Sequence, residues 1–280
     1  MGDQGAWAVI LHGGCKPIRA DQVEANRAGL NEALAAAVGC LEAGGSALDA
    51  AEAAVVAMED DPIFNAGRGS VRRADGSVEM DAAVMDGDTL AIGGVCLVRE
   101  VQNPVRLARR HIDGPETLLA RPDVVGPSPG PTPQTAPVGG DTVGCVALDV
   151  SGRIAVAVST GGLGGARPGR IGDTPLPGCG FYADSHVGGV AATGVGESIS
   201  RTLLSARTIL ALEAGRDPQA AVEAALVKLE SVGGEAGLIA LDRSGRLGWS
   251  HSGDQFAVGW ALGPSPILHI AIEGLEGADG

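Results

Sequence analysis

The chain has 280 residues, enough for one large domain, and 45% of them are hydrophobic, so a packed globule is expected rather than disorder. Its formal net charge of -14, without a basic cluster, argues against nucleic acid and anionic membrane surfaces as partners. No apolar run is long enough to span a membrane, so no transmembrane segment is expected.

The cysteines and the amino terminus favour a cytoplasmic location. The chain has 5 cysteines, an odd number without a CxxC pair, and most of them stand in apolar runs, which is typical of buried, reduced thiols. The opening residues, MGDQGAWAVILHGG, lack a basic segment followed by an apolar one. No signal peptide is therefore expected.

Apolar periodicity, capping residues and glycines predict the elements of the first part of the chain. These are a strand over 7–11, a helix over 21–43 with Asp21 as its N-cap, a helix that Ser46 caps and that ends before Pro62, a hairpin over 70–87 that turns at Asp75-Gly76, a strand over 91–97 and a helix over 103–110.

Residues 121–140, RPDVVGPSPGPTPQTAPVGG, are rich in proline and glycine, lack periodicity, and are interpreted as a flexible linker. Beyond them come two apolar strands over 142–150 and 152–160, a loop over 161–180, a strand over 187–196, a helix over 198–214, a helix capped by Asp217 and ended by Gly233-Gly234, and two strands around Ser244-Gly245. Near-continuous apolar strands imply sheets covered on both faces. An α+β fold is predicted, a four-layer αββα sandwich in a single domain.

The junction of linker and strand, Gly139-Gly140-Asp141-Thr142, is the most informative point of the sequence. If the bond between Asp141 and Thr142 is cut, Thr142 carries a hydroxyl nucleophile together with its own α-amine. A free α-amine has a pKa of roughly 7.7–8. It can therefore deprotonate the hydroxyl near neutral pH without a histidine.

The predicted hairpin brings a second hydroxyl close to the first. If Asp149 pairs with Arg153 across a three-residue turn, Thr142 lies opposite Thr160 to within about one register step. Directly opposite Cβ atoms are ~4.5–5.5 Å apart, so the two hydroxyls would interact. The competing interpretation, two ordinary strand threonines, is favoured by β propensity when spacing alone is considered.

Three further motifs supply groups that bind charge. Arg170 and Asp173 share the loop PGRIGD, where they can clamp the carboxylate and ammonium of an amino acid, although a loop salt bridge is the better explanation when this motif is taken alone. Thr193 and Gly194, in TGVGE, stand where a strand enters a helix and can stabilise an oxyanion, or merely form a turn. Asn65 lies in FNAGRG, a glycine-rich turn that is otherwise a connector.

Together these residues resemble a known family. LHGG, DPIFNAGRGSV, DGSVEMDAAVMDG, NPVRLAR, DTVGCVALD, STGG, PGRIGDTP and TGVGE occur in this order over nearly the whole chain. The set resembles the plant-type asparaginase/isoaspartyl aminopeptidase family of N-terminal nucleophile hydrolases, relatives of glycosylasparaginase. The resemblance implies hydrolysis of the L-asparagine side-chain amide and of β-aspartyl dipeptides.

The resemblance also implies a role for each matched residue. Thr142 would be the nucleophile, released when the chain cleaves itself into subunits 1–141 and 142–280. Thr160 would hydrogen-bond the nucleophile, and Arg170 and Asp173 would hold the α-carboxylate and α-amine of the substrate. The remaining matches are Thr193 and Gly194 as the oxyanion hole and Asn65 beside the active site.

No cofactor is expected to be required for catalysis, but family members carry a structural sodium ion and form dimers of cleaved heterodimers. The ion would be held by backbone carbonyls of Met58, Glu59, Asp61, Phe64, Ala66 and Arg68. The sequence departs from the family in two respects. Gly140 stands where many relatives have histidine, and the linker is short.

Four alternatives remain open. A glycosylasparaginase-like amidase would use the same chemistry, and an uncleaved relative would bind an amino acid without turnover. Catalysis by Cys145 or Cys179 with a histidine is disfavoured, because Cys145 lies within an apolar strand and His12 is interpreted as a turn residue. A metal hydrolase is disfavoured, because the sequence shows no His/Asp/Glu set with the spacing of metal ligands.

Overall fold

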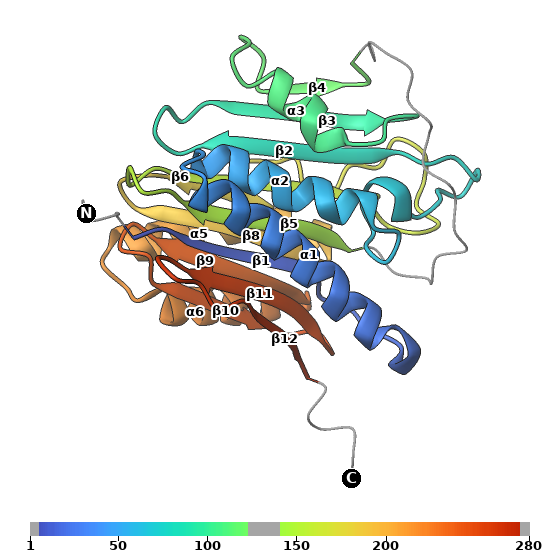
Figure 1. Ribbon diagram of the computed structural model, residues 1–280. Coiled ribbons are helices and arrows are strands. Elements are labelled where there is room, and N and C mark those ends of the chain that lie inside the picture. The colour runs from blue at the N-terminus through green and yellow to red at the C-terminus, as the bar shows by residue number, and fades with distance from the viewer. Residues whose placement is uncertain (1–5, 123–140, 275–280) are drawn as a thin grey trace.

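The computed structural model describes residues 6–122 and 141–274, which form six α-helices and two β-sheets (Figure 1). The helices are α1 (Val23–Glu42), α2 (Ala47–Asp60), α3 (Pro104–Arg110), α4 (Gly196–Thr202), α5 (Leu204–Glu213) and α6 (Pro218–Glu230). The eight-stranded sheet has the order β12-β11-β1-β5-β6-β2-β3-β4, with the respective bounds His269–Glu273, Phe256–Leu262, Ala8–Gly14, Thr142–Leu148, Ile154–Thr160, Met80–Asp86, Ile92–Val98 and Leu118–Ala120. The four-stranded sheet has the order β10-β9-β8-β7, with the bounds Leu247–His251, Ala236–Asp242, Gly188–Gly194 and Phe181–Asp184.

Three hydrophobic clusters pack the helices and the two sheets together. One joins α1, α2 and α3 to a face of the larger sheet, where Leu34 and Val55 are fully buried. The second lies where β1, β5 and β6 face β7, β8 and β9, and it includes Ile10 and Ile239. The third joins the smaller sheet to α5 and α6, around Leu226. Both sheets are therefore apolar on both faces, as the unbroken apolar strands predict.

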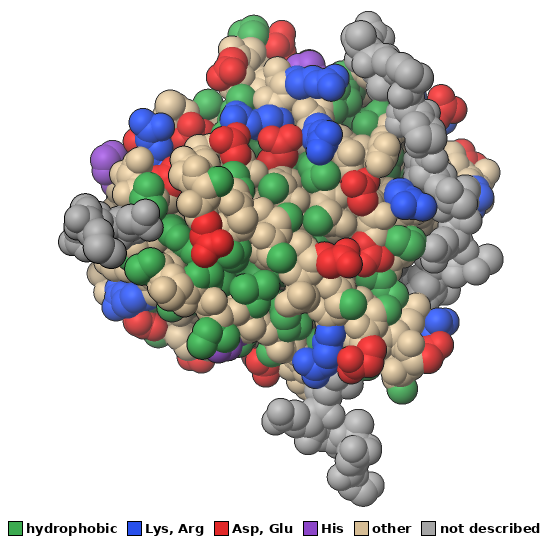
Figure 2. Space-filling view, in the orientation of Figure 1, with side chains coloured by type: hydrophobic (Ala, Val, Ile, Leu, Met, Phe, Trp, Pro, Cys, Tyr) green, Lys and Arg blue, Asp and Glu red, His purple; other side chains and the backbone are tan. Residues whose placement is uncertain are grey.

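The outer surface of this arrangement differs from the interior in charge. On the face that carries α1 and α2, acidic and basic side chains are scattered among hydrophobic and other side chains (Figure 2). Among the helices of residues 6–122 and 141–274, none is both long and apolar enough to cross a membrane.

The β5–β6 hairpin confirms the predicted register. Thr142 is paired with Thr160 and Leu148 with Ile154. The Asp149 carboxylate closes the turn by accepting hydrogen bonds from the amides of Ser151 (2.8 Å) and Arg153 (3.2 Å). The two threonines therefore lie directly opposite each other at the end of the hairpin.

Two capped helices are also confirmed, but a third prediction of this kind is wrong. Ser46 accepts a hydrogen bond from the amide of Asp49 at the start of α2, and Asp217 accepts one at the start of α6. Asp21 does not cap α1, which begins at Val23. The Asp21 carboxylate is paired with Arg19 at 3.1 Å within a short 3-10 turn instead.

The single helix expected over 198–214 is divided into α4 and α5. Leu203 adopts a left-handed conformation with φ 52° between them. Two amides in the first turn of α5 then bond to the loop that precedes β7. The amide of Ser205 donates to the carbonyl of Cys179, and that of Ala206 donates to the carbonyl of Gly178. Because these partners are distant in sequence, the helical periodicity continues through a break that tertiary contacts impose.

The hairpin expected over 70–87 is only partly formed. Its turn at Asp75-Gly76 is present, closed by the amide of Arg73 bonding to the carbonyl of Ser77 at 2.8 Å. The first half is not a strand, since pairing begins at β2. Strands β4, β7, β11 and β12 were not predicted, and residues 123–140 of the expected linker lie outside the described part of the chain.

Candidate active site

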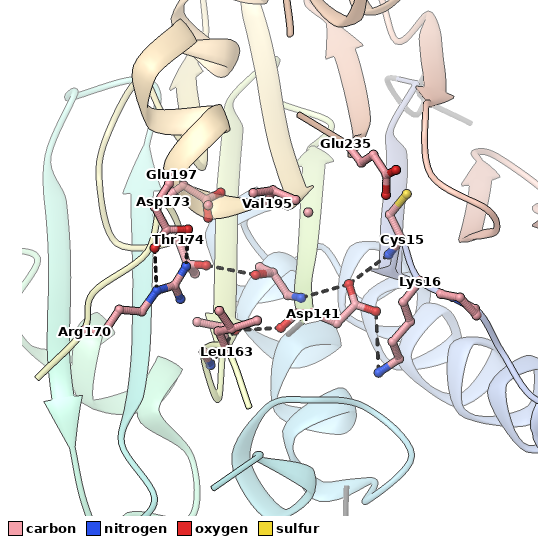
Figure 3. Close-up of a pocket in the computed structure, with 16 residues that line it drawn as sticks. Cys15, Lys16, Asp141, Leu163, Arg170, Asp173, Thr174, Val195, Glu197 and Glu235 are labelled. Atoms are coloured by element: carbon pink, nitrogen blue, oxygen red, sulfur yellow. Dashed lines mark hydrogen bonds and ion pairs between the residues drawn. The ribbon is translucent and has the colours of Figure 1, made fainter. Parts of the chain in front are cut away.

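A cavity of about 230 Å³ lies at the end of β5 and β6, and it brings together most of the residues singled out by the sequence (Figure 3). Thr142 and Thr160 come from the two strands of the hairpin, Arg170 and Asp173 from the loop after β6, and Gly194 from the end of β8. The lining also includes Cys15, Lys16, Pro17, Asp141, Gly162, Leu163, Thr174, Val195, Gly196, Glu197 and Glu235.

The carbonyl between Asp141 and Thr142 is held by two side-chain donors. Asn65 Nδ2 donates to it at 2.8 Å and Thr160 Oγ1 at 2.6 Å. Asn65 is itself fixed, because its amide also bonds the carbonyl of Gly162 at 2.8 Å. Two preorganised donors on one carbonyl oxygen are suited to stabilising the negative charge that develops there during nucleophilic attack.

The hydroxyl of Thr142 contacts Thr174, a residue that the sequence reading did not single out. The two Oγ1 atoms are 2.9 Å apart and both side chains are buried. The amide of Thr142 lies 3.1 Å from Thr193 Oγ1. In the continuous chain, the hydroxyl of Thr160 is used by the Asp141 carbonyl instead of by the hydroxyl of Thr142. Thr174 belongs to the PGRIGDTP motif, which is the only sequence signal that could have indicated it.

The side chain of Asp141 lies at one end of the cavity, surrounded by donors. Its Oδ1 accepts hydrogen bonds from the amide of Cys15 (2.8 Å), the hydroxyl of Thr193 (2.7 Å) and the amide of Thr142 (3.1 Å). Lys16 Nζ is 3.6 Å from Oδ2. Burial raises the pKa of Asp141, and the charge of Lys16 opposes that shift.

Arg170 and Asp173 lie at the other end. Arg170 makes two hydrogen bonds to the Glu197 carboxylate, both at 2.9 Å, which is the paired geometry that a guanidinium also offers to a ligand carboxylate. Asp173 is buried, and its Oδ2 has no hydrogen-bond partner among the described residues. Burial raises the pKa of Asp173 to about 7, although Arg170 opposes the shift. An unpartnered buried carboxylate is suited to receive an ammonium group.

The loop that carries Arg170 is anchored from below by a buried ion pair. Glu79 Oε2 accepts a hydrogen bond from the amide of Gly169 at 2.7 Å, and Arg73 donates to the carbonyl of Arg170 at 3.2 Å. Arg73 and Glu79 are 3.5 Å apart and neither side chain is exposed. The same carboxylate also pairs with Arg99 at 2.7 Å and Arg121 at 3.3 Å. The sequence reading missed this support, since the four residues are ordinary charged positions in the sequence.

Thr193 and Gly194 end β8 beside Thr142. Gly194 has a φ of 138°, and a Cβ at this position would lie 2.3 Å from the carbonyl oxygen of Glu235. Only glycine fits here, because both the backbone conformation and the space exclude a side chain. The end of β8 therefore packs closely against the backbone of Glu235, and its contact with Thr142 is made by the Thr193 hydroxyl.

In the loop after α2, two glycines pack directly against backbone carbonyl oxygens, and the sodium site expected there stays a prediction. A Cβ at Gly67, where φ is 51°, would lie 2.4 Å from the carbonyl oxygen of Glu59, and one at Gly69 would lie 1.9 Å from that of Phe64. Carbonyl oxygens are suitable ligands for a hard cation. Carbonyls of Asp61 and Ala66 also accept backbone hydrogen bonds, from Phe64 (3.3 Å) and Gly69 (3.1 Å). The described residues hold no group of three or more His, Cys, Asp or Glu side chains that could bind a metal ion.

Histidine-assisted cysteine catalysis lacks support in this geometry. Cys145 is fully buried within β5, and burial raises the pKa of its thiol far above the usual value. Burial also raises the pKa of Cys179. The interpretation of His12 as a turn residue is wrong, because His12 lies within β1. Burial lowers its pKa to about 3. An imidazole with that pKa is too weak a base for catalysis near neutral pH.

Known proteins similar to this chain come from the family that the order of the motifs indicates. A family model described as asparaginase matches residues 5–124 and 123–265. An isoaspartyl peptidase/L-asparaginase of Danio rerio is 37% identical over 294 residues, which cover 94% of each chain. The protein of the same name from Homo sapiens is 36% identical over 296 residues, covering 95% of this chain and 96% of its own. Because the family model and these relatives span nearly the whole sequence, the chain belongs to the asparaginase family.

Proposed function

We propose that the protein hydrolyses the side-chain amide of L-asparagine and the isoaspartyl bond of β-aspartyl dipeptides, with Thr142 as its nucleophile. The names of the relatives support this substrate class. The observation that carries the proposal is the position of Thr142, whose hydroxyl and amide contact Thr174 and Thr193 in the same cavity as Arg170 and Asp173.

Maturation begins with attack of the Thr142 hydroxyl on the Asp141 carbonyl. Asn65 and Thr160, which already donate to that oxygen, stabilise the negative charge that forms on it. The hydroxyl proton passes to the Thr142 nitrogen as the C–N bond breaks, which leaves an ester. Water then hydrolyses the ester and releases residues 1–141 from residues 142–280.

In the mature enzyme the free α-amine of Thr142, with a pKa of roughly 7.7–8, deprotonates the hydroxyl. Arg170 takes the substrate α-carboxylate and Asp173 its α-ammonium. The substrate carboxylate displaces the Glu197 carboxylate from Arg170 at a small free-energy cost, because the Glu197 side chain is 59% exposed and exposed ion pairs are weak.

Thr193 and Gly194 then stabilise the oxyanion formed at the β-carbonyl of the substrate. The Thr193 hydroxyl, bonded to Asp141 in the continuous chain, becomes available to the substrate after the bond is cut. Thr160, no longer needed by the Asp141 carbonyl, is placed opposite Thr142 to assist the nucleophile. Ammonia or the amine of an amino acid leaves, and water hydrolyses the β-aspartyl ester.

Four further expectations belong to this proposal. The layers described above form the αββα sandwich of N-terminal nucleophile hydrolases. The carbonyls of the loop after α2 hold a structural sodium ion, which acts on stability and not in the reaction. The cleaved protein is a dimer of heterodimers, and its location is cytoplasmic.

An intact-mass measurement tests the proposal. The wild-type protein should yield two fragments, one of which begins at Thr142, and should release ammonia from asparagine. Thr142→Ala should abolish both cleavage and turnover. Thr208→Val is the matched control, since Thr208 is also buried but bonds only the Leu204 carbonyl within α5.

Two results would contradict the assignment. One is a Thr142→Ala variant with near wild-type activity, and the other is a wild-type chain that stays at full length after prolonged incubation. Glycosylated asparagine is included among the substrates, because a glycosylasparaginase would prefer it to free asparagine and to β-aspartyl dipeptides.

A further inference from the structure

The cavity has two charged ends, on opposite sides of the Asp141–Thr142 junction (Figure 3). Arg170 and Asp173 form one end, and Lys16 forms the other. We propose that Lys16 and the amide of Cys15 bind the α-carboxylate of the amino acid that leaves when a β-aspartyl dipeptide is cleaved. This inference rests on the proposed function and deepens it, because it names what distinguishes dipeptides from asparagine.

A carboxylate already occupies this end in the continuous chain. The Asp141 carboxylate accepts a hydrogen bond from the Cys15 amide at 2.8 Å, and Lys16 Nζ lies 3.6 Å from its Oδ2. That oxygen has no hydrogen-bond partner among the described residues, so Lys16 is the group that balances its charge. The Asp141 side chain is 2% exposed, whereas that of Lys16 is 25% exposed and reaches in from the rim.

The carboxylate of Asp141 shows that this end of the cavity lies beside Thr142. With the aspartyl α-groups on Arg170 and Asp173, the scissile amide lies at Thr142 and the leaving nitrogen points away from Arg170. The α-carboxylate carbon of the leaving residue is about 2.5 Å from that nitrogen. Asp141 Oδ1 lies 3.1 Å from the nitrogen of Thr142, so a carboxylate at this position is within reach of the leaving residue.

Cleavage of the chain changes which carboxylate can bind Lys16 and the amide of Cys15. In the precursor Asp141 is joined to Thr142, and its carboxylate is held there by the covalent bond as well as by its hydrogen bonds. After cleavage only non-covalent contacts hold it, and the carboxylate of a dipeptide competes for the same cation and amide. Glu235 also lines this end, and its charge disfavours a leaving residue with an acidic side chain.

The two substrate classes differ in the group that Lys16 would bind. A β-aspartyl dipeptide releases an amino acid whose α-carboxylate can pair with an ammonium group. Asparagine releases ammonia, which has no such group. Lys16 therefore favours dipeptides with a free carboxyl terminus, and it should contribute nothing to the hydrolysis of asparagine.

The test compares three substrates on the cleaved enzyme, with cleavage verified by intact mass: β-aspartyl-leucine, its carboxamide β-aspartyl-leucinamide, and asparagine. The wild type should have a kcat/KM about tenfold higher for the acid than for the carboxamide. Lys16→Met should lose that advantage while its kcat/KM for the other two substrates stays within about twofold of the wild-type value. Lys16→Arg should keep the advantage, as should Lys228→Met, which removes the only other lysine, an exposed residue of α6.

Equal loss on all three substrates would overturn the proposal, because Lys16 would then act in catalysis or structure in general. An acid-to-carboxamide ratio near one in the wild type would also overturn it. That ratio needs no variant, so it decides the question even if Lys16→Met fails to fold or to cleave. Failure of the proposed function gives a different result, namely that none of the three substrates is hydrolysed.

Discussion

The two ends of the cavity are built differently. The Arg170 end rests on a buried ion pair between Arg73 and Glu79, which holds the loop backbone and makes no contact with the Asp141–Thr142 bond. The Lys16 end is held by the carboxylate of Asp141, one residue before Thr142. In the proposed mechanism the first end is therefore preformed before cleavage, whereas the second changes its partner when the bond is cut.

This difference separates maturation from turnover. Residues that contact the Asp141 carbonyl should control the rate of self-cleavage. Residues at the Arg170 end should affect turnover alone, because their contacts are complete without the scissile bond. The following variants are chosen to break that separation if it is incorrect.

Among these variants the largest effect is expected for Thr160→Val, which replaces the hydroxyl with a methyl group of similar size. Removing one donor from the Asp141 carbonyl should slow self-cleavage about 100- to 1,000-fold. A time course of intact-mass spectra on freshly purified protein measures the rate, with Thr208→Val as the control. A cleavage rate close to that of the wild type would show that the 2.6 Å hydrogen bond does not stabilise the transition state.

Asp173→Asn should have a smaller effect, and on turnover only. It removes a charge-assisted contact with the substrate ammonium, which corresponds to a loss of about 10- to 100-fold in kcat/KM for asparagine. The variant should still cleave itself at the wild-type rate, which is the result that sharpens the comparison. If its self-cleavage slows as much as its turnover, the two ends are not independent.

The smallest effect is the change of kcat/KM with pH near neutrality. Burial raises the pKa of Asp173 to about 7, so this carboxyl gains a proton as the pH falls through that value and no longer attracts an ammonium group. The α-amine of Thr142 must also be neutral, and its pKa is roughly 7.7–8. With both groups titrating, log kcat/KM should fall with a slope approaching two below about pH 6.5.

Asp173→Asn removes one of these two titrations, so its slope should be close to one over the same range. Thr208→Val should keep the wild-type profile. A wild-type slope of one, or an unchanged slope in Asp173→Asn, would show that Asp173 stays ionised over the range or that its charge is not used in binding.

Much of the proposed catalytic set can be predicted from local sequence. The turn at Asp149–Arg153 and the two-residue period of the strands place Thr160 opposite Thr142, because register in a tight hairpin follows from the turn. The joint motifs then assign Arg170, Asp173 and Gly194 to the same cavity, and the structure brings all three there. Helices capped by a side chain, such as α2, are equally local and were predicted correctly.

Only the tertiary structure decided the remaining contacts, since their partners are far apart in sequence. Lys16 and Asp141, or Glu79 and Gly169, show no shared pattern that would pair them. The first two meet because β1 pairs with β5, and the other two because β2 pairs with β6. The break at Leu203 likewise depends on loop carbonyls that a helical period cannot reveal. The sequence by itself determined the hairpin and the family, and it led to Thr142 as the proposed nucleophile. The fold determined which charges surround Thr142, because those charges come from segments joined only by packing.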